Sequence, residues 1–174
     1  MPGYPLYLKL EGKRCLVFGG GEVATRKVGA LLSRGARVIC VSKEFSGPLK
    51  RLAKKNGSRL VLKRGTKVGA GLKPTPAVVI AATSDRGFNE RVARVCRKKR
   101  IWVNVVDDPE LCDFYVPAVV EKGPLQIAIS TGGASPLFAK RLRELLERAI
   151  PASTGPLLLK LEKLRNQTVR KKRT

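Results

Sequence analysis

The sequence predicts an α/β fold: a Rossmann-type doubly wound parallel sheet, followed by a small dimerisation region and a short helical C-terminal part. Three observations lead to this prediction. Short β-branched runs alternate with helical patterns over the first two thirds of the 174 residues. A glycine-rich turn joins the first strand to the first helix, and the pattern changes after Asp113.

Five strands and three helices are expected in the first part. The strands are Arg14–Phe18, Arg37–Val41, Arg59–Leu62, Ala77–Ala81 and Ile101–Val106, and the helices are Val23–Ser33, Phe45–Lys55 and Asp85–Lys99. The segment 63–73 is rich in glycine, and we expect a loop there with at most one helical turn. Because strands alternate with helices, the crossovers are right-handed and the sheet is parallel.

The remaining chain predicts a different arrangement. Two strands, Phe114–Ala118 and Leu125–Ser130, are expected to form a hairpin. Ser135 is suited to cap a helix that Pro136 opens and that ends at Ala149. Leu157–Leu164 is amphipathic and helical, and residues 170–173 are expected to be frayed. We therefore expect a Rossmann domain at 1–113, a dimerisation and substrate region at 114–152 and a basic helical tail at 153–174.

Composition excludes several classes of protein. No apolar run approaches the ~20 residues of a membrane span, and the N-terminus lacks the pattern of a signal peptide, so we expect a cytoplasmic protein. The chain has no histidine, and its cysteines are too far apart for a zinc-finger pattern. We therefore expect no metal site and reduced thiols at all four cysteines, which are Cys15, Cys40, Cys96 and Cys112.

The charge balance is strongly basic. With 36 Lys and Arg against 13 Asp and Glu, the formal net charge is +23. Such a surface attracts polyanions, which include nucleic acids and polycarboxylate substrates. A solvated basic surface without a partner explains the same count. Composition alone leaves these three explanations open.

A dinucleotide site is predicted at the first strand-to-helix turn. Gly19, Gly21 and Ala24 fit the pattern G-x-G-x-x-A. The first glycine permits the tight turn, the second lets a pyrophosphate approach the backbone, and Ala24 lets helix and strand pack closely. Glu22 and Val23 begin the helix, whose free N–H groups and positive dipole end favour phosphate.

Two further strand ends are expected to face the cofactor. An acidic residue after the second strand binds the adenosine ribose in this fold, and here Glu44 comes slightly late. Lys43 is suited instead to a 2′-phosphate, so the strand end leaves NAD and NADP open, and we take NAD as the expected cofactor. Thr83, after the fourth strand, either contacts the nicotinamide ribose or caps the next helix.

Several longer motifs carry a family resemblance. They are Gly19-Gly20-Gly21-Glu22-Val23-Ala24-Thr25-Arg26-Lys27, Ala81-Ala82-Thr83-Ser84-Asp85, Val103-Asn104-Val105-Val106-Asp107-Asp108-Pro109, Cys112-Asp113-Phe114 and Ile127-Ala128-Ile129-Ser130-Thr131-Gly132-Gly133-Ala134-Ser135-Pro136. Over roughly residues 4–152, their order and spacing resemble precorrin-2 dehydrogenase, which also forms the N-terminal part of bacterial siroheme synthases. The resemblance implies a homodimer, NAD-dependent oxidation of precorrin-2 to sirohydrochlorin, and a key carboxylate at Asp107. Several members have serine at the position of Thr131.

Elementary chemistry agrees with this implication. Hydride transfer needs a positioned nicotinamide, while proton removal needs a base near the cofactor. Asp107 follows the fifth strand, where we expect it to be partly desolvated beside Asp108; a role in shaping the turn before Pro109 is the alternative. Asn104 is suited to orient substrate or cofactor, or to tie down its strand. Ser130 and Thr131 are candidates to bind substrate carboxylates, or they simply belong to a glycine-rich turn.

Three other functions remain compatible with the sequence. Some members of the family also insert iron into the product, which makes a bifunctional dehydrogenase and ferrochelatase one alternative; the absence of histidine predicts weak chelation here. A basic Rossmann-fold protein that binds anions or nucleic acid is the second, although the 5% aromatic content argues against a nucleic-acid partner. A non-catalytic NAD sensor is the third.

Overall fold

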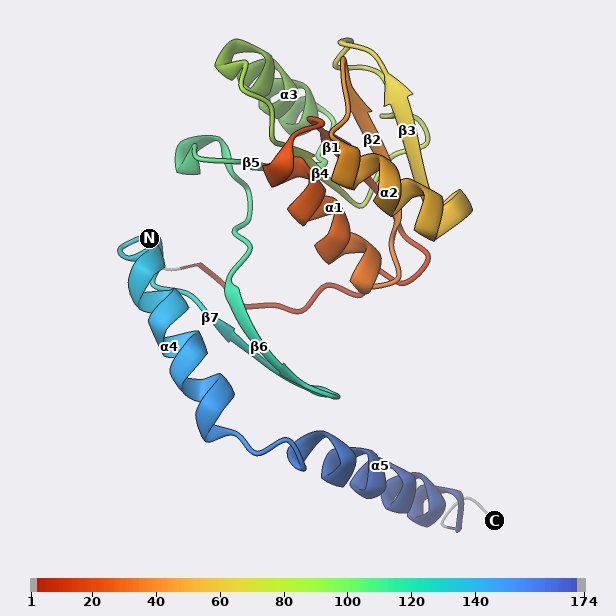
Figure 1. Cartoon of the computed structure of the whole chain (residues 1–174), viewed down its shortest axis with the longest axis vertical. Helices are drawn as coiled ribbons and strands as arrows, with labels where there is room; N and C mark the ends of the chain where they lie inside the picture. The colour runs from red at the N-terminus through yellow and green to blue at the C-terminus, as the bar shows by residue number, and fades with distance from the viewer. Residues whose placement is uncertain (1–2, 172–174) are drawn as a thin grey trace. The chain divides into compact units, whose positions relative to one another are not determined.

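The computed structural model describes residues 3–171 (Figure 1). Tyr4–Tyr115 forms one compact unit, and the residues from Val116 onward, together with Gly3, form a second. The helix expected to form a separate tail lies in the second unit, and the predicted three-part division stays a prediction. Among the described residues, no helix is long and apolar enough to cross a membrane. The cytoplasmic location also stays a prediction.

The first unit is built on the predicted parallel sheet. Its strand order is β3-β2-β1-β4-β5, with every neighbouring pair parallel. The strands are β1 (Arg14–Phe18), β2 (Arg37–Ser42), β3 (Leu60–Arg64), β4 (Val78–Ala81) and β5 (Trp102–Val105). The order moves outward from β1 in both directions, which confirms the doubly wound architecture.

Helices cover both faces of this sheet (Figure 1). They are α1 (Glu22–Ser33), α2 (Gly47–Asn56) and α3 (Arg86–Lys98), with short 3-10 turns at Gly57–Arg59 and Pro109–Leu111. Successive residues of β1 alternate between two cores: Val17 packs with the residues of α1 and α2, and Leu16 packs with those of α3. Ser46 caps α2 by accepting from the Leu49 N–H, and Asp85 caps α3 by accepting from the Phe88 N–H.

Most boundaries in the first unit differ from the prediction by one or two residues, and the end of β3 is the one that changes a predicted loop into strand. Lys63 and Arg64 were expected in a loop but belong to β3, where they lie opposite Val41 and Ser42 of β2. The parallel ladder continues through them because β2 itself extends to Ser42. The segment 65–77 contains turns and no helix.

The second unit consists of a hairpin and two helices. Strands β6 (Ala118–Lys122) and β7 (Leu125–Ile129) pair antiparallel, and α4 (Pro136–Ala149) starts at the predicted Ser135 cap. Its core contains Val120, Ile129 and Ala139. The prediction for β6 was wrong by four residues. The cause is Phe114, which belongs to the first unit: its carbonyl accepts a hydrogen bond from Asn104, and its side chain packs against the core of that unit.

The last helix, α5 (Thr154–Lys171), is longer than the predicted Leu157–Leu164. Its continuation includes Thr168, whose hydroxyl donates to the Leu164 carbonyl one turn earlier. Residues 170 and 171 belong to this helix, while 172 and 173 lie outside the described residues, and the expectation that this end is frayed stays a prediction. Gly155 lies close to Gly123 in the hairpin turn, so the start of α5 packs on the hairpin.

Candidate active site

The glycine turn lies at the carboxyl edge of the sheet, between β1 and α1. Gly19 has a φ of +125°, and a Cβ there would collide with the Ala82 carbonyl at the end of β4. Ala24 lies against the same turn, 3.4 Å from that Cβ position. Both residues are thus placed as the G-x-G-x-x-A pattern predicts, and the turn brings the ends of β1 and β4 together.

Gly20 is a second obligatory glycine that the motif treats as a free position. A Cβ on Gly20 would collide with the Glu44 carbonyl, and the Gly20 carbonyl accepts a 2.8 Å hydrogen bond from the Ser46 N–H. The loop after β2 therefore packs directly on the turn. The run of three consecutive glycines was the sequence signal for this close approach.

Gly21 differs from its two neighbours because open space surrounds it. Nothing lies within 4 Å of the position that a Cβ would take. Gly21 is the N-cap of α1 and no side chain caps the helix, so the first-turn N–H groups at Glu22 and Val23 are available to a ligand. Protein packing does not require a glycine here, whereas a bound pyrophosphate does, so the turn fits the predicted dinucleotide.

The end of β2 presents no acidic side chain to the turn. Ser42 occupies the last strand position, and its Oγ lies 2.8 Å from the Cβ position of Gly20. Lys43 and Glu44 follow it and are exposed. Glu44 meets the glycine turn through its backbone carbonyl, so its predicted contact with the cofactor ribose stays a prediction, as does that of Lys43.

Thr83 lies after β4 and is hydrogen-bonded within the protein. Its hydroxyl lies 2.7 Å from Asn89 Oδ1, and Asn89 Nδ2 donates to the Thr83 carbonyl at 2.9 Å. Asp85, not Thr83, caps α3. The structure therefore gives Thr83 a role in holding the strand end against α3, and its contact with the cofactor stays a prediction.

Asp107 follows β5 at the same edge of the sheet. Its φ of +61° lies in the left-handed region, which costs a non-glycine residue roughly 1 kcal/mol or more. The side chain is exposed, which contradicts the expectation of partial desolvation. Asp108 lies near Arg86, with 3.7 Å between carboxylate and guanidinium. The two neighbouring carboxylates therefore have different surroundings.

Lys27 is a cation whose charge interacts with the Asp107 carboxylate. It lies in the second turn of α1 and is half-buried. Burial lowers its pKa and the neighbouring Arg26 lowers it further, while the fields of Cys112 and Asp107 act in the opposite direction. Lys27 forms no ion pair with any carboxylate of residues 3–171. A partly desolvated, unpaired ammonium is a suitable receiver for an anionic group of a ligand.

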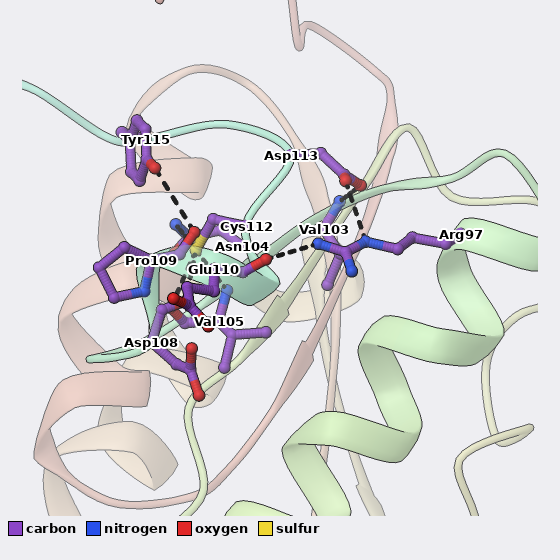
Figure 2. Close-up of polar contacts among 10 residues, drawn as sticks. All are labelled: Arg97, Val103, Asn104, Val105, Asp108, Pro109, Glu110, Cys112, Asp113 and Tyr115. Atoms are coloured by element: carbon purple, nitrogen blue, oxygen red, sulfur yellow. Dashed lines mark hydrogen bonds and ion pairs between the residues drawn. The ribbon is translucent and has the colours of Figure 1, made fainter. Parts of the chain in front are cut away.

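Asn104 lies in β5 and is 6% exposed. Its Nδ2 donates to the Phe114 carbonyl at 3.0 Å. The same Nδ2 contacts Cys112 Sγ at 3.4 Å (Figure 2). Its Oδ1 is buried and has no hydrogen-bond partner among the residues that the structure describes. The Asn104 amide thus ties down the strand, which is one of the two roles expected from the sequence. Its predicted contact with a ligand stays a prediction.

Ser130 and Thr131 belong to the second unit, after β7. Ser130 Oγ accepts from the Gly132 N–H at 3.2 Å, and Thr131 Oγ1 accepts from the Ser135 N–H at 3.0 Å. Both hydroxyls shape the turn that leads into α4, and each keeps a proton to donate. Their binding of substrate stays a prediction.

Family comparisons agree with the fold and the glycine turn. Residues 6–118 match a family described as "Putative NAD(P)-binding", and residues 122–149 match one described as "Sirohaem biosynthesis protein central". A solved structure titled "SirC, precorrin-2 dehydrogenase" superposes with a TM-score of 0.77 at 31% identity, covering 94% of this chain and 79% of that one.

Longer relatives share the same region. The siroheme synthase of Methylococcus capsulatus is 43% identical over 154 residues, covering 88% of this chain and 32% of its own. The siroheme synthase of Methylobacillus flagellatus is 44% identical over 160 residues, covering 90% and 33%. The chain therefore spans about a third of the length of these relatives. It belongs to the NAD(P)-binding family of siroheme biosynthesis that includes precorrin-2 dehydrogenase.

Proposed function

We propose that this chain oxidises precorrin-2 to sirohydrochlorin with NAD. The carrying observation is that Asp107 and the glycine turn share one edge of one sheet, where a base and a dinucleotide are both needed. The likeness to a precorrin-2 dehydrogenase over 94% of the chain supports the choice of substrate. NAD, when bound, supplies the carbon that accepts the hydride.

The chain's own residues bind, orient and remove a proton. N–H groups at the start of α1 hold the pyrophosphate, and the open space at Gly21 admits it. A ring carbon of the macrocycle loses a hydride, which carries away the electron pair of its C–H bond. Asp107 takes a proton from another position of the macrocycle. Lys27 attracts a substrate carboxylate to the same edge. Asn104, Ser130 and Thr131 are proposed to orient the substrate.

The direct test follows NADH formation from enzymatically made precorrin-2 under anaerobic conditions. Replacing Asp107 with asparagine is expected to reduce kcat by roughly 10²- to 10⁴-fold, the usual contribution of a general base. Asp108→Asn is the matched control, because that carboxylate faces Arg86, and it should keep kcat within about threefold. Turnover that survives in Asp107→Asn removes Asp107 from the chemistry. A wild-type protein without turnover overturns the function.

We also propose that the chain acts as a homodimer formed through its second unit. Leu137 and Phe138, at the start of α4, are 66% and 59% exposed. Along α5, four leucines are about half exposed: Leu157, Leu159, Leu161 and Leu164. Large exposed apolar side chains of this kind are typical of an interface. Light scattering should give twice the chain mass, and Phe138→Ser should shift the equilibrium toward monomer.

A further inference from the structure

The outer edge of β5 is covered by the segment that follows it in the chain. The Asp113 N–H donates to the Val103 carbonyl at 2.8 Å, and the Val103 N–H donates to Asp113 Oδ2 at 3.0 Å. Arg97 holds this segment from α3, donating to the Glu110 carbonyl at 2.8 Å (Figure 2). A loop with side-chain hydrogen bonds thus replaces a sixth strand.

Cys112 lies at the centre of this covering loop. The Val105 N–H donates to Cys112 Sγ at 3.2 Å, and Sγ lies 3.1 Å from the Val105 carbonyl. The same sulfur lies 3.3 Å from the Asp108 carbonyl (Figure 2). One thiol therefore contacts the backbone two residues before Asp107 and one residue after it. No other side chain of the described residues is hydrogen-bonded on both sides of Asp107.

Asp107 needs such support because its backbone is left-handed. A non-glycine residue keeps this conformation only where its surroundings fix it. Local backbone bonds contribute, since the Val106 N–H donates to the Ala81 carbonyl at 2.9 Å. They hold one side of Asp107, whereas Cys112 joins both sides. Loss of the thiol would remove the bonds nearest to Asp107, and the loop would then be held on β5 only further along, at Asp113 and Phe114.

We propose that Cys112 is a positioning residue, which holds Asp107 in the geometry that the reaction needs. The inference rests on the proposed dehydrogenase function and names a residue that acts through Asp107 without touching substrate. Burial raises the pKa of the Cys112 thiol, and Asp108 and Asp113 raise it further, against the lowering by the Val105 hydrogen bond and Lys27. The thiol therefore keeps its proton and can donate to a backbone carbonyl.

A double-mutant cycle tests the proposal. Cys112→Ala is expected to reduce kcat roughly 10- to 100-fold, with KM and NAD affinity nearly unchanged, because misplacement of a catalytic group acts on the chemical step. In an Asp107→Asn background the same replacement should change kcat less than twofold. Cys112→Ser, which keeps a donor and an acceptor, should recover part of the activity. Equal losses in both backgrounds would overturn the proposal.

A second measurement needs no turnover and separates this inference from the proposed function. Amide hydrogen exchange of residues 106–111 should be faster in Cys112→Ala, while exchange in β1 stays unchanged. Cys96→Ala is the matched control, because this thiol lies in α3 and is buried in the core between α3 and the sheet. Unchanged exchange in 106–111 would show that Cys112 does not hold the loop, whatever the activity.

Discussion

The two edges of the parallel sheet protect their exposed backbone in different ways. At β5 the loop 106–114 returns along the strand, and Cys112 and Asp113 bond to it. At β3, no other backbone segment of the described chain is hydrogen-bonded to the outer edge, and the exposed Lys63 and Arg64 follow the apolar residues. Both devices prevent pairing between sheets. Only the covered edge also fixes a candidate catalytic residue in place.

Charge divides between the same two edges. The loop at β5 contributes four of the 13 acidic residues: Asp107, Asp108, Glu110 and Asp113. The segment 45–84, which includes α2 and β3, contains nine Lys and Arg and no acidic residue. No ion pair of the described chain involves this segment. Carboxylates are therefore concentrated in the loop that covers β5, whereas cations are concentrated on the segment around β3, whose edge is uncovered.

The largest effect is expected from a substitution that disrupts the covered edge at β5. Asp113→Ala leaves the Val103 N–H without its acceptor and Arg97 without its carboxylate, so we expect a loss of about 1–3 kcal/mol in the free energy of unfolding. Asp113→Asn keeps an acceptor oxygen and should lose less than half of that. Urea unfolding measures both, and equal losses would mean that the Val103 bond does not hold this edge.

The stability of the protein core between the two edges is expected to depend on pH in the alkaline range, because three buried cysteines lie there. Burial raises the pKa of Cys40 to about 12 and of Cys15 and Cys96 to about 11, above the ordinary 9.0. A pKa raised in the folded state gives stability that is complete below pH 9 and declines as pH rises toward the folded pKa. Between pH 8 and 9.5 each thiol should contribute a decline of about 1 kcal/mol.

The control for this pH dependence is Cys40→Ala. The variant starts less stable but should lose less stability over the same pH interval, because one titrating group is gone. Urea midpoints at several pH values measure the slope. A slope identical to that of the wild type would show that Cys40 does not titrate differently in the two states.

The next prediction breaks the uncovered edge. Replacing Lys63 and Arg64 with valine extends the apolar run from Leu60 and leaves the strand without edge charges. We expect concentration-dependent self-association with the free energy of unfolding changed by less than about 0.5 kcal/mol. Size-exclusion chromatography over a range of concentrations measures the association. Lys50→Val, on α2, is the control and should stay unassociated.

Sequence reasoning was accurate where local pattern determines structure. The boundaries of β1 and the Ser135 cap of α4 were predicted to the residue, because an apolar run and a cap are local signals. It was inaccurate where tertiary contacts decide, as for β6, whose expected start at Phe114 is instead bound to β5 within the first unit. The exposed side chain of Asp107 was missed for the same reason.

The candidate site shows the same limit. The motif predicted the tight turn at Gly19, but it could not reveal that Gly20 is fixed by the Glu44 carbonyl. The half-buried setting of Lys27 and the contacts of Cys112 depend on how the loop after β5 folds back. Spacing along the chain carries no information about that return. A cysteine within an acidic loop was the available signal for Cys112.

The smallest expected effect concerns the cations beside β3, through steering of the substrate. Because precorrin-2, the proposed substrate, is a polycarboxylate, an unpaired positive surface should raise its rate of encounter, and kcat/KM should fall severalfold as ionic strength rises. Lys50→Glu with Lys54→Glu, on exposed positions of α2, should weaken this salt dependence while kcat stays unchanged. Charge reversal at Lys160 and Lys163, on α5, is the control. If the α2 and α5 double substitutions weaken the salt dependence of kcat/KM equally, the total charge of the protein attracts the substrate, and the cations beside β3 are not specifically responsible.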